Sequence, residues 1–225
     1  LGLAGIGEPD EREKEFMDVA AGFRMAAAPA YRACRWETQD AVNRGWIADM
    51  SALLDEHEGV IAPKLASLYQ LPWPEQRLDI DVVQTVSWAG ANSFFPRGNV
   101  GHLLISPNYQ GFEALETIFH EASHGFMLRG APLQRALGNA AAELGVDVPQ
   151  GLWHVVLFVT TGETVRAAVD AGAEQGYVPM IFEVYGRSSW GRYKEAMDVV
   201  WPSYLDGTLD ADTGMLRLIQ EVTRK

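Results

Sequence analysis

Two histidines and a glutamate in one short segment have the types and spacing of a hydrolytic metal site. His120 and His124 are four residues apart, so an α-helix places both imidazoles on one face, one turn apart. Two neutral imidazole nitrogens at this spacing can bind one tetrahedral zinc ion at about 2.0–2.1 Å. Glu121 follows the first histidine and can take a proton from zinc-bound water, whose pKa the metal lowers towards about 7. The motif therefore predicts a zinc site with Glu121 as the general base.

A catalytic zinc site needs a third protein ligand, and Glu163 is our first candidate. It ends a largely apolar segment, 152–163, in which an ionised carboxylate is costly to bury without a partner such as zinc. Thr160 and Glu163 also have the spacing of a capping box, which would place Glu163 at a helix start after a break at Thr161-Gly162. We predict Glu163 as the third ligand, with the capping role as the alternative.

His154 competes with Glu163 for the same role. On one unbroken helix the two residues would face opposite ways, because nine residues turn through about 900°. Both could reach one metal only if Gly162 breaks the helix. A lone buried histidine is usually a hydrogen-bonded core residue, and the functional alternatives for His154 are third ligand or donor to an oxyanion. No feature of the sequence favours a metal role for His57 or His102.

The elements before the motif are expected to be a helix and two strands. Apolar residues recur at three- and four-residue steps from Trp46 to Tyr69, which predicts a helix that ends at Leu71-Pro72-Trp73-Pro74. Alternation of apolar and polar residues predicts a strand within 78–88, and a second strand is expected at 102–106 after a turn at 96–99. We expect the two strands to pair in a small antiparallel sheet.

Helices should dominate the chain from the motif onwards. The first, about 111–128, carries the motif beside an apolar stripe. The second, about 152–171, is apolar nearly all round in its first half and should be buried. An irregular stretch opens at 177–179, and further helices are expected at about 192–201 and 212–225.

No convincing linker divides the 225 residues, so we expect one α+β domain. Its parts are a helical segment, 1–75, a core with the sheet and the metal site, 76–171, and an irregular and helical segment, 172–225. The net charge of −12 argues against a nucleic-acid partner, since phosphate binding needs a basic surface. No apolar run approaches the roughly 20 residues needed to span a bilayer.

The single cysteine, Cys34, excludes an intrachain disulfide and a cysteine-rich metal site. The chain begins with Leu1 rather than Met, which would suit removal of a signal peptide. A periplasmic or secreted location is therefore slightly favoured over a cytoplasmic one. The sequence indicates no oligomeric state.

The motif residues resemble those of the gluzincin group of zinc metallopeptidases, in which His-Glu-x-x-His on one helix precedes a glutamate ligand on a later helix. The matching residues are His120, Glu121 and His124, followed by Glu163. The resemblance spans 102–171 and implies a zincin-like fold, a bound Zn²⁺ and a peptide or protein substrate. It also implies that the strand at 102–106 is an antiparallel edge strand that binds an extended peptide.

Gluzincins often add a tyrosine or histidine that steadies the tetrahedral intermediate. Tyr185, in the expected irregular stretch, is a candidate for this role, with an ordinary half-buried tyrosine as the alternative. Many gluzincins also carry an acidic residue one turn after the third ligand, where this chain has Ala167. The predicted function is a zinc metallopeptidase. The alternatives are a non-catalytic protein with structural zinc and a metal-free ligand-binding module with an aromatic-rich cleft.

Overall fold

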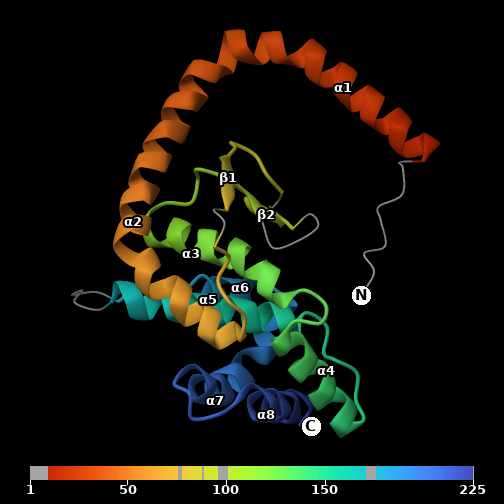
Figure 1. The fold of residues 1–225 in the computed structure, drawn as a ribbon, viewed down its shortest axis with the longest axis vertical. Coiled ribbons are helices and arrows are strands. Elements are labelled where there is room, and N and C mark those ends of the chain that lie inside the picture. The colour runs from red at the N-terminus through yellow and green to blue at the C-terminus, as the bar shows by residue number, and fades with distance from the viewer. Residues whose placement is uncertain (1–9, 76–77, 88, 96–100, 171–175, 225) are drawn as a thin grey trace. The chain divides into compact units, whose positions relative to one another are not determined.

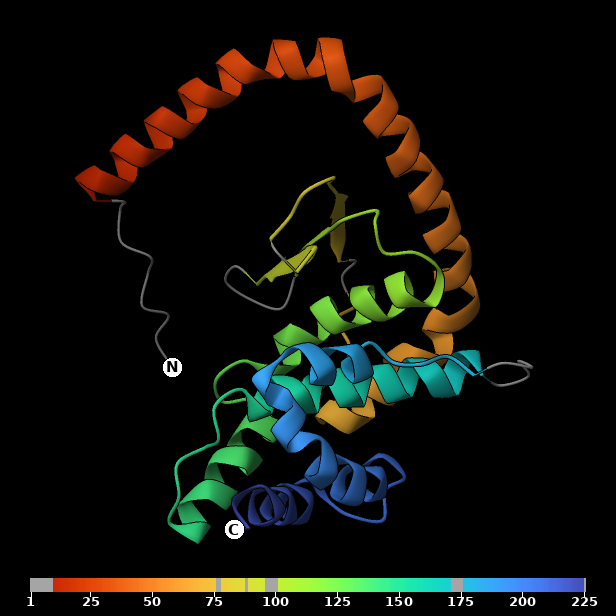
Figure 2. The same ribbon diagram turned by 180° about the vertical axis from the view of Figure 1, so that it is seen from behind.

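The computed structural model describes residues 10–75, 78–87, 89–95, 101–170 and 176–224 (Figures 1 and 2). The chain divides into two compact units, 1–45 and 46–225, and the second contains all the elements that position the site. Helices make up most of the structure, with one small mixed sheet. No helix in the described ranges is long and apolar enough to cross a membrane.

The first unit contains a helix, α1 (Glu11–Tyr31), which has no buried side chain. A capping box at Asp10 begins α1. The Asp10 carboxylate accepts a hydrogen bond from the Glu13 amide at 2.8 Å, and the Glu13 carboxylate accepts one from the Asp10 amide at 3.0 Å. A π-helical segment, Arg32–Trp36, leads into α2 (Glu37–Tyr69). The predicted end of this helix before Leu71 is confirmed.

The sheet has three short strands, and its topology differs from the predicted one. The strands are β1 (Asp79–Val82), β2 (Ala91–Phe94) and β3 (His102–Ile105), in the order β1-β3-β2. We expected β1 and β3 to be antiparallel, but they are parallel. Parallel neighbours need a crossover connection, and the chain between them supplies β2, which pairs antiparallel with β3. The predicted turn at 96–99 lies outside the described residues.

The central place of β3 corrects a second expectation. We expected this strand to be a free edge that could bind an extended peptide, but β3 is hydrogen-bonded on both sides. Among the strands that the structure describes, β2 is the antiparallel edge strand. An added strand would therefore have to pair with β1 or β2.

The motif helix, α3 (Gly111–Ser123), lies between the sheet and α5 (Leu152–Val169) (Figures 1 and 2). Its sheet-facing side packs Ala114 and Ile118 against β3, and an adjacent side packs Leu115 and Phe119 into the larger helical core. Every side chain from 114 to 123 is consequently buried. The predicted helix over 111–128 is shorter than expected, because His124–Met127 continue as a 3₁₀ turn.

The remaining helices form the other side of the helical core. Two of them, α7 (Lys194–Leu205) and α8 (Ala211–Thr223), lie close to the predicted positions. We did not predict α4 (Pro132–Leu144), although Pro132 in its first turn and Gly145 in a left-handed conformation at its end are typical helix boundaries. The segment predicted to be irregular contains α6 (Ile181–Arg187), followed by a 3₁₀ segment, Ser189–Tyr193.

Candidate metal centre

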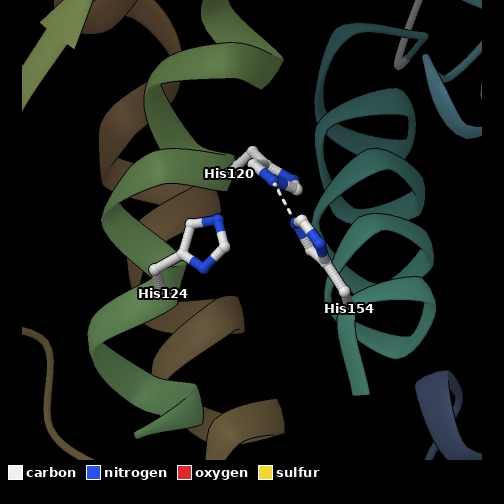
Figure 3. A group of neighbouring side chains, drawn as sticks. All are labelled: His120, His124 and His154. Atoms are coloured by element: carbon white, nitrogen blue, oxygen red, sulfur yellow. Dashed lines mark hydrogen bonds between the residues drawn. The ribbon is translucent and has the colours of Figure 1, made fainter. Parts of the chain in front are cut away.

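Three histidines from two helices meet between α3 and α5 (Figure 3). His120 lies in the last turn of α3, His124 directly follows that helix, and His154 lies in the first turn of α5. Each offers a ring nitrogen, and these nitrogens lie within 4.8 Å of one another. The Nε2 atoms of His120 and His154 are 3.1 Å apart. Two nitrogens on one tetrahedral zinc at about 2.0–2.1 Å would be separated by about 3.3–3.4 Å, so the observed spacing is close to that of a shared ion.

Burial keeps all three imidazoles in the form that binds metal. Desolvation lowers the pKa of His124 from its ordinary 6.5 to about 4. Desolvation and the neighbouring His124 lower the pKa of His154 to about 3. The pKa of His120 also falls well below 6.5, through desolvation and then through the two nearby histidines. The rings are therefore neutral at neutral pH, and no proton has to leave before a metal binds.

Glu121 supplies a buried carboxyl beside the histidines. Its Oε2 atom is 3.9 Å from His124 Nε2. Burial raises the pKa of Glu121 to about 7, and a hydrogen bond from the Ser93 hydroxyl partly opposes that rise. A pKa near the working pH suits a general base. Ser93 comes from β2, a strand that we did not predict, and no local pattern in the sequence marked it.

The third predicted ligand, Glu163, lies apart from the three histidines. The metal-binding group found among the described residues does not include it. Its carboxylate instead forms an ion pair with Arg166, one turn further along α5. Because α5 is unbroken from Leu152 to Val169, Glu163 and His154 lie on opposite sides of the helix. The geometry thus favours His154 over Glu163 as the third ligand.

The capping alternative for Thr160 and Glu163 is wrong. Thr160 lies in the middle of α5, and its hydroxyl donates to the carbonyl of Val156 at 2.6 Å. Gly162, which we considered as a break, stays helical and serves a different purpose. A Cβ at this position would lie 2.7 Å from Pro179 Cβ and 3.0 Å from Glu116 Oε1. The glycine therefore lets two other segments approach α5 closely.

The other residues considered from the sequence lie outside the histidine group. Tyr185 is on α6, where its hydroxyl is buried without a hydrogen-bond partner in the described structure, and its ring contacts Phe182. The pKa of Tyr185 is raised, first by burial and then by nearby acidic groups. His102 pairs with Asp81 at 2.8 Å on the exposed side of the sheet. His57, on α2, packs edge-on against another aromatic ring.

Aromatic rings surround the histidines on the α5 side. The Phe158 ring centroid is 3.8 Å from that of His120. Trp153 stacks on His154 with centroids 4.7 Å apart, and Trp190 lies 5.0 Å from the same imidazole. These contacts restrict how the imidazoles can turn. The sequence suggested only that this apolar segment would be buried, so it did not reveal these neighbours.

The metal-free chain is expected to lose stability steeply with acid below about pH 4.5. Unfolded histidines take up protons near pH 6.5, whereas folded His124 and His154 do so near about 4 and about 3, so acid favours the unfolded state. Glu116 and Glu121 have the opposite effect on stability between pH 7 and 4.5, because their pKa is about 7 in the folded chain and about 4.5 in the unfolded chain, so acid there favours the folded state. The histidine and glutamate effects on the unfolding free energy therefore partly cancel above pH 4.5, and only the histidine effect remains below it.

Denaturant unfolding at fixed pH values, with a chelator present, measures this dependence. A His154→Phe variant provides the matched control, because it lacks one of the protons that unfolding takes up. Between about pH 4 and 6 its unfolding free energy should fall less steeply with acid than that of the natural chain, by about 1.4 kcal/mol per pH unit. Equal slopes for the two chains would show that folding does not disfavour protonation of His154.

Comparisons of the chain with protein-family models, with curated proteins and with solved structures gave no match.

Proposed function

We propose that this chain is a zinc-dependent hydrolase of peptide or other amide bonds. His120, His124 and His154 would hold the ion, and Glu121 would be the general base. The observation that carries the proposal is the meeting of three neutral imidazoles from α3 and α5 beside a buried carboxyl. Three protein ligands leave one coordination position for water or substrate, which is the arrangement of catalytic zinc sites.

The chemistry assigned to the chain's own residues is proton transfer. Zinc, when bound, would act as a Lewis acid on the water and on the substrate carbonyl. Glu121 would take the proton from the attacking water and pass it to the leaving amine. The Ser93 hydroxyl would hold the Glu121 carboxyl in place, because it donates a hydrogen bond to it from the neighbouring strand.

The zincin-like fold and the peptide substrate are part of the same proposal. An active-site helix beside a small sheet with an antiparallel edge strand suits the resemblance to gluzincins, although a third histidine in place of a glutamate departs from their ligand pattern. We assign the peptide-binding edge to β2, because Ser93 on this strand contacts the proposed base. An extended substrate would pair with the β2 backbone and so pass close to Glu121.

A purely structural zinc site is the second candidate. Such sites are usually closed by four protein ligands, so His154 and Glu163 would both have to bind. The continuous α5 helix opposes that arrangement, since it places these two residues on opposite sides. We therefore favour a site with an open position. A metal-free ligand-binding role would be supported only if the purified chain took up no metal.

Cleavage of an unbiased peptide library tests the proposed activity. The zinc-loaded chain should cut peptides, and a chelated sample of the same preparation should not. Adding zinc back to the chelated sample should restore cleavage, which separates metal dependence from irreversible damage. If the chain binds zinc stoichiometrically but cuts no peptide or amide, the peptidase proposal fails and the structural role gains support.

A further inference from the structure

Two buried polar atoms without partners lie one turn apart on the motif helix. In the described structure, the buried side-chain atoms that lack a hydrogen bond are Glu116 Oε1, His120 Nδ1 and the Tyr185 hydroxyl. The first two belong to α3 and are four residues apart. A buried donor or acceptor without a partner is costly, so such atoms call for an explanation. One of these two atoms can accept a hydrogen bond and the other can donate one.

The Glu116 carboxylate is held in place by hydrogen bonds to its other oxygen, Oε2. Oε2 accepts hydrogen bonds from the Tyr177 hydroxyl at 2.7 Å and from the Met180 amide at 3.1 Å. Oε1 faces α5, where a Cβ on Gly162 would lie only 3.0 Å away. The carboxylate is thus held with one free acceptor in the interface between α3 and α5. His120 lies in the same interface, against Phe158.

His120 needs an acceptor at Nδ1 if it binds metal. Its Nε2 atom faces His154 Nε2 at 3.1 Å, so Nε2 is the nitrogen directed towards the proposed ion (Figure 3). A neutral imidazole that binds through Nε2 carries its proton on Nδ1. Side chains four residues apart on a helix have Cβ atoms about 5–6 Å apart, a separation that a small side-chain rotation or one bridging water can close.

We propose that Glu116 is a positioning residue for the metal centre. With metal bound, its Oε1 accepts a hydrogen bond from Nδ1–H of His120, directly or through one water. This bond fixes the tautomer and the orientation of the imidazole. The inference rests on the proposed function in one respect, since it requires His120 to be a metal ligand. It adds a carboxylate that the metal motif itself does not contain.

Glu116→Gln and Tyr177→Phe form a matched pair of variants for the test. In Glu116→Gln the amide oxygen should replace Oε2, because the Met180 N–H can only donate. The amide nitrogen then replaces Oε1, and two donors face each other at His120. In Tyr177→Phe the carboxylate loses one bond to Oε2 and keeps Oε1. Glu116→Gln therefore removes the proposed contact with His120, whereas Tyr177→Phe removes only one of the two hydrogen bonds to Oε2.

Zinc affinity, measured on the full chain by competition with a chelator, should fall by about 10–100-fold in Glu116→Gln, the usual effect of losing an outer partner of a ligand. Tyr177→Phe should bind zinc nearly as well as the natural chain. Proton–nitrogen NMR of the zinc-loaded histidines gives a second readout that folding alone would not change. The His120 Nδ1–H signal should persist in Tyr177→Phe and shift or vanish in Glu116→Gln.

Three results would overturn the inference while leaving zinc binding established. The first is unchanged affinity in Glu116→Gln, and the second is an equal loss in both variants, which would make Glu116 a structural anchor only. The third is an Nδ1–H of His120 that exchanges freely with solvent in the natural chain, a measurement that needs no variant. A natural chain that takes up no zinc would overturn the proposed function together with this inference.

Discussion

Replacing His154 by alanine is expected to abolish stoichiometric zinc binding, whereas Glu163→Gln should leave it intact. His154 Nε2 faces His120 Nε2 at 3.1 Å, so its loss removes one of the three proposed ligands. Glu163 is paired with Arg166 on the other side of α5, and its loss should cost only that partly exposed ion pair. The loss of affinity in His154→Ala should exceed the roughly 10–100-fold of an outer-partner change. Metal analysis after dialysis measures both variants.

His57→Ala is the control for removing a histidine elsewhere in the chain, because His57 lies on α2 outside the histidine group. It should keep about one zinc per chain, as should the natural protein. His120→Ala and His124→Ala should lose zinc as His154→Ala does. Retention of zinc in His154→Ala together with its loss in Glu163→Gln would return the third-ligand role to Glu163, as first predicted from the sequence.

Replacing Glu121 by glutamine is expected to stop turnover while leaving zinc bound. Glutamine keeps the size of the side chain and can still accept the hydrogen bond from Ser93, but it cannot accept a proton from water. Peptide hydrolysis should fall by at least about 10²-fold, the low end of the range for acid–base catalysis. Zinc content and the free energy of unfolding should stay close to those of the natural chain.

Ser93→Ala provides a graded comparison for Glu121→Gln. It removes the hydrogen bond to the carboxyl but leaves the carboxyl itself, so the rate should fall by much less than in Glu121→Gln. Both variants should be compared with the natural chain on one peptide found in the library. Full activity in Glu121→Gln would refute the assigned mechanism even if the three histidines bind zinc.

The common face of His120 and His124 could be predicted from the sequence, but the presence of His154 rather than Glu163 beside them could not. The spacing of His120 and His124 determines their common face once the segment is helical, and this required no tertiary information. The choice between His154 and Glu163 depended on whether α5 breaks at Gly162. Locally, Gly162 after Thr160 looks like a helix boundary. The helix nevertheless continues through Gly162, and Pro179 and Glu116 lie close to the place that a Cβ would occupy there.

For the fold, too, the features set by local sequence patterns could be predicted, and those set by contacts between distant parts of the chain could not. The helices α5, α7 and α8 were predicted close to their observed positions, and so was the end of α2, although α2 begins nine residues before the predicted start at Trp46. The direction of β1 relative to β3 depends on the path of the connecting chain, which alternation of residue types does not record. The four residues of β2 carry no clear alternation, so the residue that contacts the proposed base, Ser93, went unrecognised.

The position of α4 in the chain has a consequence for folding. In the chain this helix lies between His124 and His154, two of the three proposed ligands, and none of its residues belongs to the histidine group found in the described structure. A bound ion would therefore close a loop of the chain that contains all of α4. Because the ion binds the folded chain and not the unfolded one, its binding free energy would add to the stability of the fold, and α4 would gain stability from an ion that it does not touch.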